Sequence, residues 1–192
     1  MTTEKNTTKT TGRETHWSAR QLAMMAVFIA LGTLLAFIPI PLLPGAPTLT
    51  YDPGNVPAII GGFAFGPVAG IIIGVMSLFL HWILSGDNWV GPVINAVLLI
   101  SIIIPAALIY RKKKTTKRLI IGLVVGCLIA MALVIPANYG AWFIYVGPDF
   151  VQSDFFFPFI LSAVLPFNVI KLSLNAILSF GLYKSLQKLL ER

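Results

Sequence analysis

The sequence predicts an all-α integral membrane protein, a six-helix bundle with both termini in the cytoplasm. Hydrophobic residues make up 57% of the 192 residues and charged residues only 11%, whereas a soluble domain has about 25% charged residues. Apolar runs long enough to cross a bilayer, about 20 residues each, recur along the chain. Nearly all the cations lie between these runs in three short segments, and their positions determine how many crossings there are.

The cations follow the positive-inside rule, under which loops rich in lysine and arginine remain in the cytoplasm. All but one of the 14 Lys and Arg residues lie before residue 21, at 111–118 or at 184–192. The connections 39–55, 85–91 and 146–158 carry aspartates and no cation. Both termini and loop 111–118 are therefore predicted to be cytoplasmic, and the acidic connections to face outside. This distribution argues against nucleic acid as the partner of the positive charge.

Six helices satisfy this charge pattern. The stretch 53–86 has no charged residue, and as one helix it would put residue 20 and loop 111–118 on opposite sides. We divide it at Gly66-Pro67, because proline favours the first turn of a helix. Helix 56–65 would then be only about 15 Å long, with loop 39–55 filling the remaining depth. The predicted helices cover residues 19–38, 56–65, 67–84, 91–110, 119–145 and 159–184.

These helices form a single predicted substrate-binding domain over residues 19–188. Residues 1–18 are polar and lack the apolar core of a signal peptide, so we expect a disordered cytoplasmic tail. The location predicted for the chain is a cell membrane, which it crosses several times.

The most informative residue is Lys171, which lies inside the last apolar run. A lysine at the centre of a membrane helix costs about 2.5–3.5 kcal/mol, so such a residue is expected to have a partner or a ligand. Asn168 lies three positions earlier and leaves the same face of the helix. A cation and an amide directed together into the bundle interior predict a site for a polar ligand.

Other polar residues allow two interpretations, ligand binding or hydrogen bonding between helices. Helix packing is favoured for His81, Asn95 and Asn175, whereas Asn138 follows Pro136 among aromatic residues. Aromatic faces beside amide groups suit a flat heteroaromatic ring. Trp89 is either an interfacial anchor or part of the mouth of the site.

Loop 39–55 contains five of the 13 prolines of the chain, which restrict its backbone. It is either a stiff connector or a preformed lid whose end reaches the ligand. The residues at that end, Thr50, Tyr51 and Asp52, include an aromatic ring and an acid, which favours the lid.

Small residues at four-residue spacing allow membrane helices to approach closely. For Gly66, Gly70 and Gly74, and for Gly122 and Gly126, we expect packing inside the bundle. On helix 19–38 the pairs Ala19-x3-Ala23 and Ala26-x3-Ala30 suit internal packing or a surface for another protein.

Several chemistries have no residues to support them. The chain has no phosphate-binding P-loop, HExxH motif or nucleophile elbow, and no predicted span carries a carboxylate. The single cysteine, Cys127, excludes an internal disulfide, and no cluster of metal ligands is present. A chain of this length is also short for a two-repeat secondary transporter. We therefore expect a non-enzymatic binding subunit without a cofactor, driven by a partner.

Three segments resemble the substrate-binding S components of energy-coupling-factor vitamin transporters, and within them the riboflavin-specific branch. They are Val56-Pro57-Ala58-Ile59-Ile60-Gly61-Gly62-Phe63 with Gly66-Pro67-Val68-Ala69-Gly70, then Pro105-Ala106-Ala107-Leu108-Ile109-Tyr110, and finally Pro166-Phe167-Asn168-Val169-Ile170-Lys171. The similarity runs from about residue 19 to 188. The last segment is the more flavin-like one.

The resemblance implies a vitamin site near the outer face, in which Asn138, Asn168 and Lys171 bind the ring system. It also implies a docking surface on helix 19–38, at Ala26-x3-Ala30 or Ala19-x3-Ala23, for a transmembrane coupling subunit that works with two ATPase subunits. We add Tyr51, Thr50, Asn95 and Trp89 to the expected substrate site. The alternatives are an S component for pantothenate, pyridoxine or a thiamin precursor, a standalone facilitator, and a membrane enzyme or assembly factor.

Overall fold

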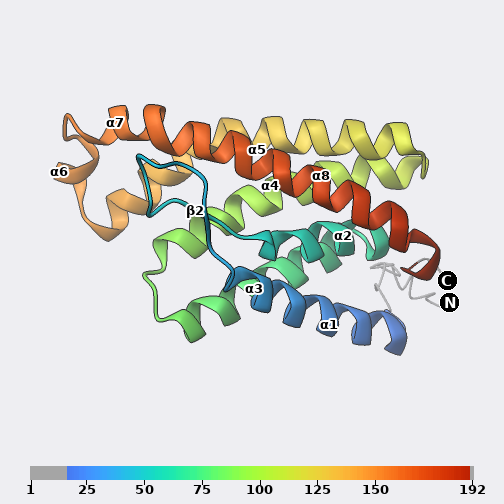
Figure 1. Ribbon diagram of the computed structural model, residues 1–192. Coiled ribbons are helices and arrows are strands. Elements are labelled where there is room, and N and C mark those ends of the chain that lie inside the picture. Colours follow the sequence, from blue (N-terminus) through green and yellow to red (C-terminus); the bar gives the residue numbers. More distant parts are fainter. Residues whose placement is uncertain (1–16, 191–192) are drawn as a thin grey trace, which may run out of the picture.

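The structure is a computed structural model that describes residues 17–190. Apart from one short hairpin, the regular elements are helical (Figure 1). In chain order they are α1 (Ala19–Ala36), β1 (Ile40–Pro41), β2 (Thr50–Tyr51), the 3-10 turn η1 (Pro53–Asn55), α2 (Val56–Phe65), α3 (Pro67–Ser85), α4 (Val90–Lys112), α5 (Thr116–Tyr145), α6 (Pro148–Val151), α7 (Phe156–Phe159), the π-helical turn η2 (Ile160–Val164) and α8 (Leu165–Leu190).

Five of the described helices are long and apolar enough to cross a membrane: α1, α3, α4, α5 and the continuous helix Phe156–Leu190. The sixth predicted helix, α2, has ten residues, so it extends only about 15 Å. The division between α2 and α3 falls at Gly66, as predicted, with φ +107°. Residues with a Cβ rarely adopt a backbone conformation with such a positive φ, so glycine is needed at this position.

Several boundaries differ from the sequence prediction. The helices α4 and α5 each extend further into loop 111–118, and the last helix begins at Phe156 and continues to Leu190. The strands β1 and β2 form an antiparallel hairpin inside loop 39–55, where no strand was predicted. Within the predicted tail 1–18, only Trp17 and Ser18 belong to the described residues.

The short helix α2 is the centre of the bundle. Eight of its ten residues are buried, and it contacts α1, α3, α4 and α8. Close packing of backbones explains the recurrent glycines: a Cβ on Gly70 would lie 2.7 Å from the Cα of Gly62, and one on Gly122 would lie 2.9 Å from the Cα of Ala106. The predicted internal role of these two glycines is confirmed.

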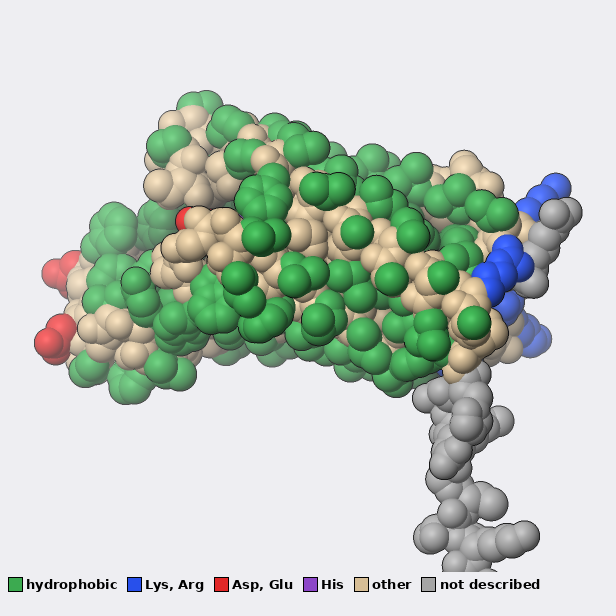
Figure 2. All heavy atoms as spheres, turned by 90° about the horizontal axis from the view of Figure 1, so that it is seen from below, with side chains coloured by type: hydrophobic (Ala, Val, Ile, Leu, Met, Phe, Trp, Pro, Cys, Tyr) green, Lys and Arg blue, Asp and Glu red, His purple; other side chains and the backbone are tan. Residues whose placement is uncertain are grey.

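The start of α1 and the end of α8 meet at one end of the molecule. The guanidinium of Arg20 donates a hydrogen bond to the carbonyl oxygen of Leu189 (2.9 Å). At the same end, Lys184 Nζ donates to Thr116 Oγ1 (2.8 Å). Figure 2 shows Lys and Arg side chains at this end, acidic side chains toward the other, and hydrophobic side chains along the length between them. A hydrophobic zone between two charged ends is the arrangement that a bilayer requires.

Candidate ligand-binding site

The predicted polar face of α8 points into the bundle. Asn168, Lys171 and Asn175 are buried, and the exposed fraction of Lys171 is only 4%. Their spacing of three and four residues places them on one side of the helix. The prediction that Asn168 and Lys171 share an interior face is confirmed.

Lys171 has an acidic partner that is distant in the sequence. Its Nζ lies 3.4 Å from Oδ2 of Asp52, and 5.8 Å from the centre of the Phe167 ring. The other oxygen of Asp52, Oδ1, accepts a hydrogen bond from the backbone N–H of Gly54 (3.1 Å). Asp52 therefore connects the turn η1 to the buried cation. None of the spans supplies a carboxylate, and loop 39–55 provides it instead.

Tyr51 connects the hairpin to the same face of α8. Its hydroxyl donates a hydrogen bond to Oδ1 of Asn175 (3.2 Å), and the side chain is buried. Burial, and then the nearby Asp52 carboxylate, raise the pKa of Tyr51 from 10.0 to about 12, because both disfavour a phenolate. The phenol thus remains a neutral donor at physiological pH. Thr50 precedes it in β2 and pairs with Pro41 of β1.

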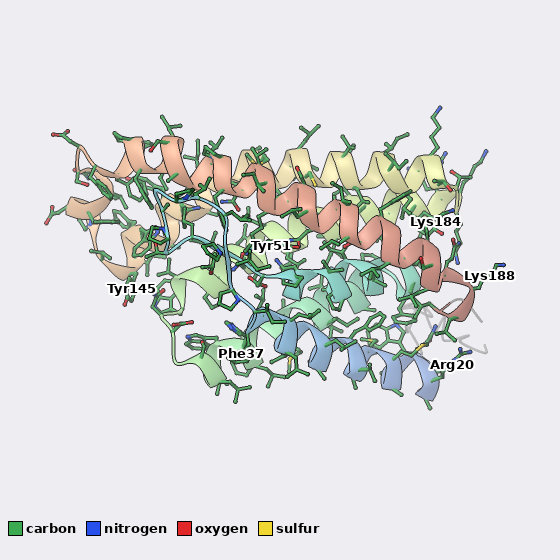
Figure 3. The ribbon with its side chains drawn as sticks, viewed as in Figure 1. Arg20, Phe37, Tyr51, Tyr145, Lys184 and Lys188 are labelled. Atoms are coloured by element: carbon green, nitrogen blue, oxygen red, sulfur yellow. The ribbon has the colours of Figure 1, made fainter. Side chains whose placement is uncertain are left out.

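These two contacts bring the end of loop 39–55 onto the polar face of α8, as the lid interpretation required. From α1 the chain runs to the α6–α7 end of the bundle and returns before α2 begins (Figure 1). Figure 3 shows Tyr51 inside the bundle, between Tyr145 at that end and Arg20, Lys184 and Lys188 at the opposite end.

The amide groups of the site are anchored on their own helices. Asn168 Nδ2 donates to the carbonyl of Val164 (2.9 Å), and Asn138 Nδ2 donates to the carbonyl of Val134 (2.8 Å). Val164 ends the π-helical turn η2, and such turns are frequent at functional sites. Both asparagines are buried, and these bonds fix the orientation of their amides. The π-helical turn has no simple signature in the sequence, and the sequence analysis did not predict it.

Two buried polar atoms lack a hydrogen-bond partner among the described residues: Nδ2 of Asn175 and Oγ of Ser179. They belong to residues four positions apart on α8. A buried polar group without a partner costs about 1–3 kcal/mol, so such a pair indicates a place for a ligand or an ordered water. The sequence analysis favoured helix packing for Asn175 and did not identify Ser179.

Aromatic rings surround the C-terminal end of α5, the end that contains Asn138. Trp142 packs on Phe150 of α6, with ring centres 5.4 Å apart, and Phe150 packs on Phe156 of α7 at 5.6 Å. Trp89, at the start of α4, lies against Tyr145 at 5.9 Å. Asn95 lies half-buried on α4.

The small residues of α1 lie on its outer surface. Ala19, Ala23, Ala26 and Ala30 are all exposed, whereas Met25 and Gly32, on the opposite side of the helix, are buried. The stripe is therefore free of internal packing within residues 17–190, which favours the second of its two interpretations.

The arrangement can bind a polar ligand. It combines one cation, amides of fixed orientation, a phenol and aromatic faces. No group of three or more His, Cys, Asp or Glu residues that could hold a metal ion occurs in the described part of the chain.

Comparison with known proteins identifies the family. The sequence profile described as "ECF transporter, substrate-specific component" matches residues 20–183. The chain belongs to this family. This S component is a transport protein of the bacterial cell membrane and not an enzyme.

Two curated relatives and one solved structure are similar over most of their length. The riboflavin transporter RibU of Staphylococcus aureus (strain TCH60) is 34% identical over 178 residues, which cover 90% of this chain and 93% of the relative. The riboflavin transporter FmnP of Bacillus subtilis (strain 168) is 28% identical over 164 residues, 79% and 84% of the two chains. The solved structure, described in "Structure and mechanism of the S component of a bacterial ECF transporter", has a TM-score of 0.77 at 31% identity and covers 90% of this chain and 98% of that one.

Proposed function

We propose that this S component captures riboflavin at the outer face of the membrane and delivers it with an ATP-driven coupling module. The observation that carries the proposal is the buried set of Lys171, Asn168 and Asn175, held against the end of the hairpin. The similar transporters RibU and FmnP, both described as riboflavin transporters, support the choice of vitamin.

Each group has a role that fits a flat heteroaromatic ring with polar edges. Lys171 donates to a ring carbonyl, and the amides of Asn168 and Asn138 bind neighbouring donors and acceptors on the edge. Tyr51 and Thr50 cover the ring from the hairpin, Trp89 closes the mouth of the site, and Asn95 adds a polar contact from α4. Stacking on aromatic side chains and a few directed hydrogen bonds are the usual basis of such recognition.

The membrane arrangement follows from the charges. We infer a six-helix bundle in which α2 spans half the bilayer and the hairpin fills the remaining depth. The end that carries Arg20, Lys184 and Lys188 faces the cytoplasm, so both termini do as well. The ligand site then lies toward the outer face, because β2, which contains Tyr51, is nearer to α6 and α7 than to the C-terminal end of α8 (Figure 1).

The partners are a transmembrane coupling subunit and two ATPase subunits, and ATP is consumed by the partners. The exposed alanines of α1, Ala26 and Ala30 with Ala19 and Ala23 as the second pair, form the docking surface. Small residues permit a partner helix to approach closely in lipid, where no hydrophobic force drives helices together. The S component itself needs no cofactor.

Flavin fluorescence tests the function directly. Protein purified in detergent from flavin-depleted cells should quench riboflavin fluorescence tightly and with one-to-one stoichiometry. An excess of pantothenate or pyridoxine should not reverse the quenching. Absence of quenching by a folded, monodisperse sample would contradict riboflavin as the ligand, and mass spectrometry of a co-purified compound would then identify another vitamin.

Reconstituted vesicles distinguish an S component from a standalone facilitator. Vesicles that contain this chain alone should bind riboflavin at their surface without accumulating it inside. Uptake should appear only when the coupling subunit, the two ATPases and ATP are present. Accumulation by the chain alone would contradict the S-component mechanism.

A further inference from the structure

The docking helix α1 touches the turn that carries Asp52, and the contact is made by two glycines. A Cβ on Gly32 of α1 would lie 2.9 Å from the carbonyl oxygen of Gly54, and one on Gly54 would lie 2.8 Å from the carbonyl oxygen of Gly32. Both residues are buried. The backbones of α1 and η1 therefore meet where even a methyl group has no room.

Asp52 is held by the same turn. One carboxylate oxygen accepts the N–H of Gly54 at 3.1 Å, and the other lies 3.4 Å from Lys171 Nζ. A Cβ on Gly54 would lie 2.9 Å from the first of these oxygens. The position of the Gly54 backbone thus determines where the carboxylate meets Lys171.

The same Cβ on Gly32 would also press against α3. A Cβ there would lie 2.7 Å from Oγ and 3.1 Å from Cβ of Ser77 on α3. The single hydrogen of the Ser77 hydroxyl is shared between the carbonyl oxygens of Ile73 (2.8 Å) on α3 and Ile29 (3.1 Å) on α1. Because the bond to Ile29 connects α1 to α3, we expect a larger side chain at position 32 to displace the turn η1.

We propose that Gly32 is a positioning residue for ligand binding, which acts through Gly54 to hold Asp52 against Lys171. The inference rests on the proposed function, since it assumes that the Lys171 site binds riboflavin. Gly32 belongs to α1, whose exposed face was assigned above to the coupling subunit, so this contact gives the docking helix a direct structural connection to the ligand site.

Gly32→Ala tests the proposal, with Gly181→Ala as the matched control. Both replace a glycine inside a helix by alanine, but a Cβ on Gly181 would meet no atom within 4 Å. Gly32→Ala should weaken riboflavin binding about tenfold, in the range typical of residues that share contacts, and Gly181→Ala should leave the dissociation constant unchanged. Equal affinities for Gly32→Ala and the wild type would overturn the proposal.

A double-mutant cycle separates positioning from general destabilisation. In an Asp52→Ala background, Gly32→Ala should change the dissociation constant less than twofold, because the carboxylate that it displaces is already absent. An undiminished tenfold effect in that background would contradict the route through Asp52. Hydrogen exchange of the segment 48–56 should also be faster in Gly32→Ala than in the wild type, since the bond between Gly54 N–H and Asp52 is loosened.

A second variant keeps the test decisive if Gly32→Ala folds poorly. The double substitution Gly32→Ala with Ser77→Ala removes the Ser77 oxygen and retains the contact with Gly54. It should still bind riboflavin about tenfold more weakly, whereas recovery of wild-type affinity would show that α3 alone was disturbed. If the wild type itself failed to bind riboflavin, the proposed function would be wrong, whereas normal wild-type binding with unchanged Gly32→Ala affinity would refute only the positioning role.

Discussion

Lys171 and Asp52 form an ion pair whose members come from a membrane helix and from loop 39–55. Lys171 is almost fully buried, whereas the side chain of Asp52 keeps 20% of its surface exposed. Breaking a fully buried pair by removing one partner costs about 3–5 kcal/mol, because a charge is left without compensation. The partial exposure of Asp52 makes a smaller effect the expected one.

Asp52→Asn should destabilise the ligand-free protein by about 1–2 kcal/mol, since the amide retains the hydrogen bond to Gly54 but no longer neutralises Lys171. Thermal unfolding in detergent, followed by intrinsic fluorescence, measures this. Asp149→Asn is the control, because Asp149 is an exposed acid in α6. The same unfolding temperature for both variants would contradict a stabilising ion pair.

The raised pKa of Tyr51 predicts that the stability of the folded protein depends on pH in the alkaline range. Its pKa is about 12 in the folded protein and close to 10 in an unfolded chain. The contribution of the neutral phenol to stability is therefore complete below pH 10 and is lost as the pH rises from about 10 to 12. In that range the unfolding temperature of the wild type should fall more steeply than that of Tyr51→Phe. Parallel curves would show that Tyr51 is not protected from ionisation.

Among the elements, α1 has a buried face that packs on α3 and an exposed face with four alanines. A bulky side chain on the exposed face leaves the interior unchanged and prevents close approach of a partner helix. Binding and assembly should therefore be separable on this helix.

Ala26→Trp should abolish co-purification with the coupling subunit and leave riboflavin affinity within twofold of the wild type. Leu31→Trp is the control, because Leu31 is exposed on α1 but lies away from the alanine stripe. Assembly that survives Ala26→Trp would exclude this face as the docking surface. Loss of ligand binding in Ala26→Trp would show that the substitution disturbs the bundle.

At the scale of the whole molecule, the charges define two ends and hence an orientation. With Cys127 replaced by alanine, a single cysteine at Asp154, between α6 and α7, should react with a membrane-impermeant maleimide in intact cells. A cysteine at Lys113, between α4 and α5, should react only after permeabilisation. Both positions are exposed, so the reverse pattern would contradict the cytoplasmic placement of the basic end.

The parts of this fold that depend on composition and local pattern could be predicted from the sequence. Charge distribution and the Gly66-Pro67 pair were enough to identify the half-length helix α2, whose bounds agree with the prediction. The interior position of Asn168 and Lys171 followed from helical periodicity. The exposure of the α1 alanines could not be decided, since a small-residue stripe suits both a buried and a docking face.

The remaining features depend on contacts between distant segments. Asp52 and Lys171 are 119 residues apart, and Tyr51 and Asn175 are 124 apart, so no local pattern pairs them. The hairpin strands have only two residues each, too few for alternation to be detected. The contact between Gly32 and Gly54 likewise depends on how α1 packs against η1.

Lys171 is the central residue of the proposed site, as the cation that binds the ligand. A comparison of two lysine substitutions tests this role directly. Riboflavin titrations should compare Lys171→Met with Lys184→Met, which removes an exposed lysine at the opposite end of α8. Loss of one partner of a buried charged hydrogen bond costs about 2–5 kcal/mol. Lys171→Met should therefore weaken binding by at least about 30-fold, while Lys184→Met binds like the wild type. Equal, tight binding by both variants would contradict the site.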